Sequence, residues 1–176
     1  AEWVTVQDAF QRHAGVDLLS TDRNRDVLAR QSPVPVAGDD SWSDIFSRIL
    51  ADRVEPQLGN GRVTVLCEYP IAEAALARPA AHDRRVAERF ELYACGVELA
   101  NGFGELTDAA EQRRRFEQDM ELKQRLYGER YPIDEELLAA LAIMPQASGV
   151  ALGLDRLIML ATGARSVAEV QWVPVP

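Results

Sequence analysis

The sequence predicts an α+β fold, in which an antiparallel β-sheet is flanked by helices. Two stretches favour the sheet: residues 62–67 are rich in β-branched side chains, and residues 86–103 indicate a hairpin around a Cys-Gly turn. Apolar residues at helical spacing, with capping residues before them, occupy much of the rest. The 176 residues, 47% of them apolar, suit one domain with a sizeable core. Within this single domain, residues 1–176, we expect a mainly helical region over 1–60 and the strands over 61–176.

The first 60 residues contain three predicted helices. Thr5 opens the first through a capping sequence that continues to Asp8, and Gly15 ends it. Residues 20–22 cap a second helix that runs to about residue 30. Residues 32–38 contain two prolines and a glycine and therefore form a loop. A third helix beyond residue 40 carries a buried apolar stripe: Trp42, Ile45, Phe46, Ile49, Leu50 and Val54.

Three stretches in the remaining chain are predicted to pair in the sheet. A turn at 59–61 introduces the strand over 62–67, which Pro70 ends. The hairpin over 86–103 follows, and a strand over 149–153 lies near the end of the chain. The sheet is therefore built around the hairpin.

Helices are predicted on both sides of the last strand. Capping residues favour helices over about 108–127 and 134–144, and an apolar helix follows residue 153. Three arginines, 113–115, lie among acidic residues in the first of these helices. We therefore expect a solvated helix face at this point, rather than a phosphate-binding site.

Composition excludes several classes of protein. The 19 basic and 28 acidic side chains leave a net charge of −9, which argues against binding nucleic acid through basic patches. No apolar run approaches the ~20 residues that cross a bilayer, and no signal peptide is visible. Two cysteines are too few for a disulfide framework, so we expect Cys67 and Cys95 to be small core residues of a cytoplasmic protein. The chain starts at Ala1 rather than Met, which favours processing or a longer parent.

The predicted hairpin carries two acidic residues, Glu91 and Glu98, whose spacing suits a shared divalent cation. A two-residue turn pairs Tyr93 with Glu98 and Glu91 with Ala100. Glu91 and Glu98 then share one face as diagonal neighbours, so their carboxylates can converge on a divalent cation. The alternative is a solvent-exposed sheet face, on which glutamates are ordinary.

The second strand of the hairpin continues with an amide, a ring and a carboxylate. Asn101, Phe103 and Glu105 are spaced by two, with small residues between them. A carboxylate beside an aromatic ring suits an ammonium group. A regular strand places Asn101 on the face opposite Glu98, so a shared pocket requires a bulge or twist near Gly102.

The strand over 149–153 and the helix after it form a second candidate site. Gly149, Ala151 and Gly153 alternate, which leaves one face nearly bare for a flat ring. Asp155 is expected to cap the helix, and Arg156 in its first turn is placed to bind a polyphosphate. Close packing of the glycines and a simple salt bridge of Arg156 are the alternatives.

Together, these two segments resemble the C-terminal part of the catalytic domain of class II lysyl-tRNA synthetases. Residues 88–106 are similar to the lysine-binding hairpin of that family, and residues 149–157 to class II motif 3. Three segments are closer to the short paralogues that attach β-lysine to elongation factor P: 83–91, 116–119 and 148–153. The resemblance runs from about Tyr69 to Val173.

The resemblance implies a role for each matching position. Glu91 and Glu98 match carboxylates that meet ATP, Mg2+ and the substrate amine. Asn101, Phe103 and Glu105 match residues around the side-chain ammonium of lysine or β-lysine. Contacts to ATP are implied for Glu91, Leu92, Gly153 and Arg156, and Arg156 takes the catalytic role.

Two further positions concern substrate choice. Ala151 stands where tRNA-charging lysyl synthetases usually carry glycine and the β-lysine ligases carry alanine, which favours the ligases. Gly104 departs from the family, where a larger polar residue is common, and leaves the detail of the amino-acid pocket open.

The resemblance also implies that part of the catalytic apparatus is absent. Nothing before Tyr69 is similar to motif 1, which builds the homodimer, or to motif 2, whose arginine binds the α-phosphate. We therefore expect a fragment or a truncated relative that is inactive alone. The intact enzyme is expected to activate lysine or β-lysine with ATP and transfer it to elongation factor P. The alternatives are a lysyl-tRNA synthetase, made less favourable by the acidic charge, a non-catalytic binding module and a purely structural domain.

Overall fold

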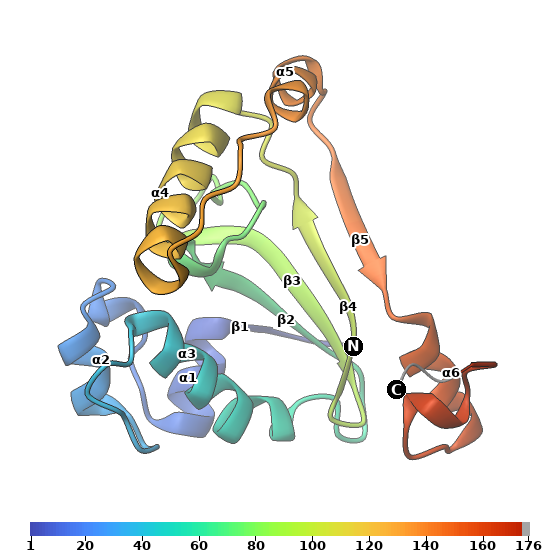
Figure 1. The fold of residues 1–176 in the computed structure, drawn as a ribbon. Coiled ribbons are helices and arrows are strands. Elements are labelled where there is room, and N and C mark those ends of the chain that lie inside the picture. The colour runs from blue at the N-terminus through green and yellow to red at the C-terminus, as the bar shows by residue number, and fades with distance from the viewer. Residues whose placement is uncertain (174–176) are drawn as a thin grey trace.

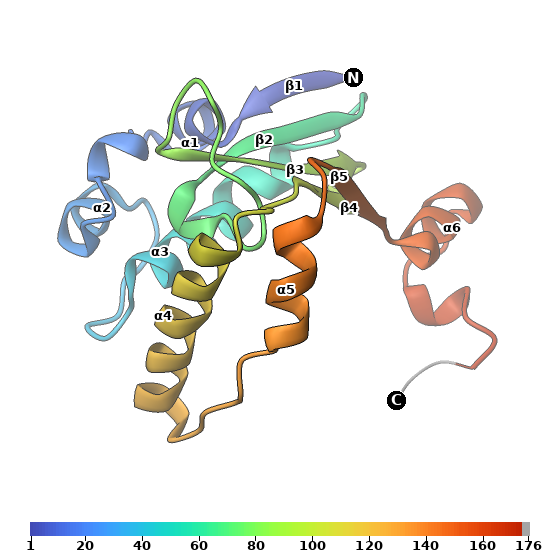
Figure 2. The ribbon, with the colours of Figure 1, turned by 90° about the horizontal axis from the view of Figure 1, so that it is seen from above.

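The computed structural model describes residues 1–173. A five-stranded sheet, in the order β1-β2-β3-β4-β5, carries helices α1 to α5 on one side (Figures 1 and 2). The strands are β1 (Glu2–Thr5), β2 (Thr64–Pro70), β3 (Val86–Ala94), β4 (Val97–Gly104) and β5 (Ser148–Leu152). The helices are α1 (Val6–Ala14), α2 (Arg25–Gln31), α3 (Trp42–Ile49), α4 (Ala109–Tyr127), α5 (Glu135–Ile143) and α6 (Leu154–Thr162). This is the predicted α+β fold with a mostly antiparallel sheet.

The first element is a strand, which the sequence did not indicate. β1 pairs in parallel with β2, so that Trp3 stands opposite Val65. Four residues are too few for a periodic signal, and parallel pairing joins segments far apart in the chain. The helical region of the first 60 residues therefore begins by extending the sheet.

The ends of α1 lie where the sequence predicted them, whereas the start of α2 does not. The Thr5 side chain accepts a hydrogen bond from the Asp8 backbone N–H at the start of α1, and Gly15 ends α1 with a φ of 69°, as predicted. The second helix starts later than predicted, because its N-cap is Asn24. Positive φ angles at Asp22 and Arg23 separate it from the preceding 3₁₀ turn.

The predicted apolar stripe of the third helix forms the centre of the core. All six of its residues are buried, and the helix continues past α3 through a π-turn at Leu50–Val54. The rings of Phe10 and Phe46 stack with centroids 5.1 Å apart. This core includes Leu66 of β2 and Tyr93 of β3, so the N-terminal helices are packed directly against these two strands.

β3 and β4 form the predicted hairpin. Cys95 and Gly96 make its two-residue turn, and both have positive φ angles, 53° and 71°. The pairs next to the turn have the predicted register, but the expected pairing of Glu91 with Ala100 is wrong. Glu91 stands opposite Asn101, because the register shifts by one residue at this point.

The C-terminal helices begin close to their predicted positions. Asp108 caps α4, and Asp134 caps α5. For α6, however, the N-cap is Gly153, and Asp155 lies in the first turn without capping. Its carboxylate instead accepts a hydrogen bond from the Gln171 side chain at 2.6 Å. No helix within residues 1–173 is both long and apolar enough to cross a membrane.

The two cysteines lie in different environments, and neither belongs to the buried core in which both were expected. Cys67 is half-buried in β2, where burial raises the pKa of its thiol to about 11. Cys95 is exposed, because the turn places it outside the sheet. Burial of the thiol and its high pKa both lower reactivity, since the thiolate is the nucleophile.

We expect iodoacetamide to alkylate Cys95 and to leave Cys67 unmodified in the folded chain near neutral pH. Peptide mass spectrometry after a timed reaction measures both sites. In urea, both thiols should react, which is the control for intrinsic reactivity. Comparable labelling of the two cysteines in the folded chain would contradict a half-buried Cys67 with a raised thiol pKa.

Candidate active site

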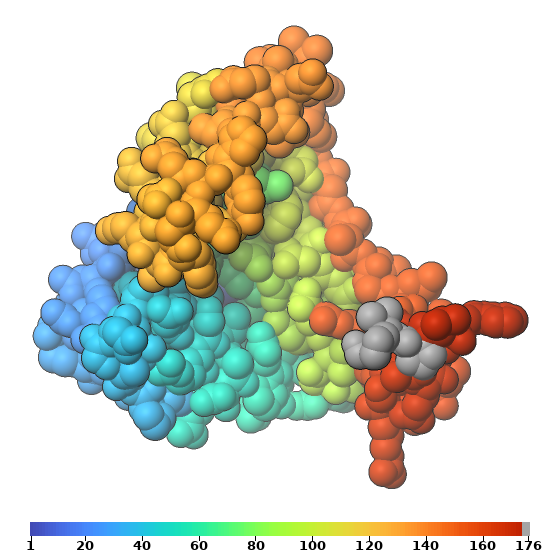
Figure 3. All heavy atoms as spheres, in the orientation of Figure 1, coloured from blue at the N-terminus to red at the C-terminus, as the bar shows by residue number. Residues whose placement is uncertain are grey.

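Apart from Leu92, the predicted site residues on the strands gather on one face of the sheet. Asn101 of β4 stands between Glu91 of β3 and Ala151 of β5, and Phe103 is paired with Gly149. Directly paired residues share a face, so these side chains form adjoining rows. Figure 3 shows this face as a hollow, with the hairpin coloured yellow-green between the N-terminal helices and the α4–α5 arm.

A β-bulge at Leu99 is what brings Glu98 onto the same face as Asn101. The extra residue in β4 reverses the alternation between them, so both belong to the face that carries Glu91. The predicted irregularity therefore exists, but it lies at Leu99 and not near Gly102. It joins the two parts of the hairpin that a regular strand would separate.

Glu91 is a buried carboxylate that accepts three hydrogen bonds. Its Oε1 atom accepts from Arg89 Nη2 at 2.7 Å and from Asn101 Nδ2 at 3.1 Å. Its Oε2 atom accepts from the Tyr93 hydroxyl at 2.7 Å. Burial and the Glu91 charge raise the pKa of Tyr93 above its ordinary value, so this hydroxyl keeps its proton. Glu91 is 6% exposed, and its orientation is set by these donors.

Glu98 and Arg156 form the second part of the site. Arg156 Nη1 donates to the Glu98 backbone oxygen at 2.9 Å and to its Oε2 atom at 3.2 Å. The Arg156 side chain crosses Gly153, where an added Cβ would lie 3.3 Å from its Cδ atom. A cavity of about 370 Å³ opens at this helix start and is lined by Gly153, Leu154, Asp155, Arg156 and Val167. Both charged side chains are partly exposed and can exchange one partner for another.

The third part of the site lies at the other end of β4. A Cβ on Gly149 would lie 2.6 Å from Glu105 Oε1, so the bare glycine makes room for this carboxylate. Among residues 1–173, no side-chain hydrogen bond or ion pair is found for the Glu105 carboxylate. The Asn101 Oδ1 atom is buried without a hydrogen-bond partner. Two acceptors therefore remain open to a ligand that donates protons.

Sequence reasoning missed three residues that contact or shape this site. Arg89 and Tyr93 flank Glu91 at spacing two, so strand alternation could have placed them on its face. Glu55 comes from the short helical turn Glu55–Gln57, and its Oε1 atom lies 3.3 Å from the Tyr93 hydroxyl. No local pattern indicates the position of Glu55, because long-range packing brings this turn to the hairpin.

Leu92 and Gly104 lie on the face of the sheet opposite to that of the other candidate residues. Leu92 lies between Glu91 and Tyr93, so its side chain points to the opposite face and only its backbone can meet a ligand at the site. Gly104 also lies on the opposite face, where an added Cβ would be 2.4 Å from Glu88 Oε2 and 3.1 Å from Arg78 Cζ. Gly104 thus makes room for the Arg78–Glu88 ion pair.

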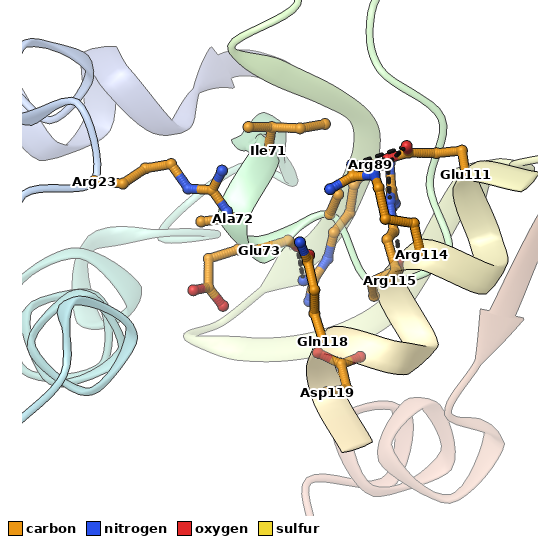
Figure 4. Close-up of a pocket in the computed structure, with 12 residues that line it drawn as sticks. Arg23, Ile71, Ala72, Glu73, Arg89, Glu111, Arg114, Arg115, Gln118 and Asp119 are labelled. Atoms are coloured by element: carbon orange, nitrogen blue, oxygen red, sulfur yellow. Dashed lines mark hydrogen bonds and ion pairs between the residues drawn. The ribbon is translucent and has the colours of Figure 1, made fainter. Parts of the chain in front are cut away.

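The three arginines of α4 are occupied by protein partners. Arg113 pairs with Glu135, and Arg114 pairs with Glu111. Arg115 donates to Glu111 and to the backbone oxygens of residues 75 and 77, beside a cavity of about 380 Å³ (Figure 4). The expectation of a solvated face holds for the first two, whereas Arg115 anchors α4 to the loop after β2.

The arrangement of the acids permits a limited role in metal binding. Within residues 1–173, no group of three or more His, Cys, Asp or Glu is arranged to hold a metal ion. Glu91 Oε2 accepts one hydrogen bond, and the side-chain contact of Glu98 is through Oε2. Each carboxylate therefore retains an open acceptor position. This fits Mg2+, which typically takes one or two carboxylates together with substrate phosphates and water.

Comparison with known proteins agrees with this geometry. Residues 44–175 match the family described as tRNA synthetases class II (D, K and N). The chain belongs to this family. Among class II relatives, it is 50% identical to a protein of Edwardsiella ictaluri, 48% to one of Klebsiella pneumoniae and 46% to one of Salmonella dublin. Each relative is named elongation factor P–(R)-β-lysine ligase, and each comparison covers 97% of this chain and 54% of the relative. This class II chain thus spans about half the length of those relatives.

Proposed function

We propose that this chain is part of an ATP-dependent ligase that activates lysine or β-lysine as an aminoacyl-adenylate and transfers it to a lysine of elongation factor P. The observation that supports it most is a single sheet face with two chemically different ends. Around Phe103 lie open acceptors of Asn101 and Glu105, which suit an ammonium group. Beyond the bulge, Glu98 and Arg156 lie at a helix start, which suits phosphates.

In this proposal, the residues act by holding and orienting groups. Glu105 accepts hydrogen bonds from the side-chain ammonium, and Asn101 Oδ1 accepts one further N–H. Arg156 leaves Glu98 to bind the terminal phosphate of ATP, while Glu91 and Glu98 each offer one oxygen to magnesium. The amino-acid carboxylate attacks the α-phosphorus of ATP and pyrophosphate leaves, and the acceptor lysine amine then attacks the adenylate carbonyl and AMP leaves. Magnesium held by these carboxylates would screen the phosphate charge. No side-chain nucleophile is needed, because positioning and charge stabilisation lower the barrier.

We propose that residues 1–176 act as one domain and that further polypeptide completes the site. The chain spans 54% of the relatives' length, so more chain is present in those ligases. β5 is an edge strand, and Val150 and Leu152 on the face opposite the site are 62% and 53% exposed. Such exposed apolar side chains favour a covering partner. A homodimeric, cytoplasmic ligase fits this proposal.

A lysyl-tRNA synthetase is the second candidate, and two observations favour the elongation factor P ligase over it. Ala151 is paired with Asn101 and adds a methyl group to the face that would hold the amino acid. The net charge of −9 gives little attraction for a tRNA backbone. The names of the relatives also specify elongation factor P and (R)-β-lysine for those proteins.

We expect pyrophosphate exchange with lysine or β-lysine from a full-length ligase that contains this chain, and none above background from the 176 residues alone. In that ligase, Glu98→Gln should weaken magnesium-ATP binding about tenfold, since one of the two proposed carboxylate ligands of magnesium is lost. Isothermal calorimetry measures the binding.

Glu111→Gln is the matched control, because Glu111 also pairs with arginines but lies outside the site. Exchange by the chain alone would exclude the half-site model. Unchanged ATP binding by the Glu98 variant would remove the hairpin from the proposed ATP site. Exchange that depends on neither amino acid would exclude the proposed substrate class.

A further inference from the structure

Tyr93 connects two acidic residues that come from different parts of the fold. Its ring lies in the core beneath the site, and the residue is 1% exposed. Its hydroxyl lies 2.7 Å from Glu91 Oε2 and 3.3 Å from Glu55 Oε1. Glu91 belongs to β3, whereas Glu55 belongs to a helical turn in the N-terminal half. Tyr93 is thus the contact between the helical region and the Glu91 carboxylate.

The two contacts of this hydroxyl are unequal. A phenol has one proton to donate, and the shorter distance assigns it to Glu91. The 3.3 Å contact to Glu55 Oε1 is the longer branch of the same donated hydrogen bond. Burial raises the pKa of Glu55, the hydrogen bond from Tyr93 lowers it, and the charges of Glu91 and Glu98 raise it further. A glutamine at position 55 would retain an acceptor oxygen for this contact.

The Glu91 carboxylate has a defined orientation only while its donors are present. Arg89 is held by the Glu73 backbone oxygen at 2.6 Å, so its guanidinium approaches Glu91 from a fixed direction. Among the described residues, Tyr93 donates the one hydrogen bond found for Glu91 Oε2, while the buried Tyr69 hydroxyl, whose pKa is raised by burial and by the Glu91 charge, has no hydrogen-bond partner. Loss of this hydroxyl would free the carboxylate to rotate, which would also loosen the hydrogen bond from Asn101 to Oε1.

We propose that Tyr93 is a positioning residue that holds the Glu91 carboxylate in line with Asn101, and that Glu55 in turn holds Tyr93. The helical N-terminal region therefore helps to organise the site, rather than only packing against the sheet. The hydrogen-bond arrangement can be tested on this chain alone. Only its consequence for catalysis rests on the proposed function.

The test uses the Asn101 side-chain amide as a reporter in the isotope-labelled full chain. Exchange of its protons with solvent is measured by NMR for Tyr93→Phe, Glu55→Ala, Glu55→Gln and the double variant Tyr93→Phe with Glu55→Ala. We expect about tenfold faster exchange in Tyr93→Phe, which removes the 2.7 Å hydrogen bond to Glu91, and about threefold in Glu55→Ala, which removes only the longer 3.3 Å contact. Glu55→Gln should exchange like the original chain, and Glu55→Ala should add nothing once Tyr93 is phenylalanine.

Tyr131→Phe is the matched control, since Tyr131 also contacts a glutamate two residues away but is exposed. It should leave the Asn101 amide unchanged. The proposal is overturned if Tyr93→Phe does not change this exchange, or if Glu55→Ala has the same effect in both backgrounds. If Tyr93→Phe fails to fold, the two Glu55 variants test the proposal. Equal exchange of the Asn101 amide in Glu55→Ala and Glu55→Gln then overturns it.

A full-length ligase provides the second readout. There, Tyr93→Phe should raise the KM for ATP or the amino acid about tenfold with a smaller change in kcat, because the site is loosened but its groups remain. A ligase without exchange activity contradicts the proposed function, while the Asn101 measurement still judges the positioning role. An active ligase with unchanged KM for both substrates overturns the positioning role in catalysis.

Discussion

Glu91→Ala is expected to lower the free energy of unfolding by about 3–5 kcal/mol. The substitution leaves the Arg89 guanidinium without its carboxylate partner in a site where the Arg89 side chain is 18% exposed. It also removes the acceptor of Tyr93 and of the Asn101 amide. An uncompensated buried charge and unpaired donors each cost free energy. Urea denaturation followed by circular dichroism measures the loss.

Glu2→Ala is the matched control for this prediction. Glu2 also contacts two arginines, Arg12 and Arg62, but both are well exposed to solvent, which screens the charges. We expect a much smaller loss of stability there. Equal losses for the two variants would show that burial does not determine the strength of the Glu91 interactions.

Gly59→Ala is expected to destabilise the chain by about 3 kcal/mol, through backbone strain and overpacking together. Gly59 has a φ of 72°, and an added Cβ would lie 2.7 Å from Ala94 Cα and 2.8 Å from Ala94 N. These are backbone atoms of β3, so no side-chain rotation relieves the clash. The Gly59 oxygen also accepts a hydrogen bond from the Cys95 N–H, which ties this loop to the hairpin turn.

Gly61→Ala separates the two causes. Gly61 has a similar φ of 76°, but nothing lies within 4 Å of an added Cβ. We expect a cost of about 1 kcal/mol from the left-handed backbone alone. Urea unfolding of both variants measures the difference, and an equal cost would contradict the close contact between Gly59 and β3.

The hairpin illustrates how far the sequence predicts the site. The Cys95-Gly96 turn and the shared face of Glu91 and Glu98 are confirmed, because turn chemistry and strand alternation act over a few residues. The sequence predicted a bulge or twist near Gly102, but the one-residue bulge lies at Leu99. Its position depends on hydrogen bonds to two neighbouring strands, which no local pattern encodes.

The contacts of Arg156, in the C-terminal part of the site, could also be predicted only in part. The sequence located Arg156 in the first turn of α6 and predicted a charged ligand for it. It did not indicate that Arg156 would reach back across Gly153 to Glu98, because these residues are 58 positions apart. The sequence also did not show whether Gly104 belongs to the amino-acid pocket. The strand pairing places Gly104 on the opposite face, beside Glu88.

Local chemistry in the sequence was sufficient for the types of the main elements other than β1, the buried stripe of α3, the turn of the hairpin and the residues that carry the family resemblance. Capping residues, periodicity and turn residues act over a few positions, so they can be recognised in the sequence without knowledge of the fold. The pairing of β1, the bulge at Leu99 and the approach of Glu55 to Tyr93 emerged only from the folded chain. Each of these depends on hydrogen bonds and packing between segments far apart in sequence, and such contacts form only when the whole sheet and its helices assemble.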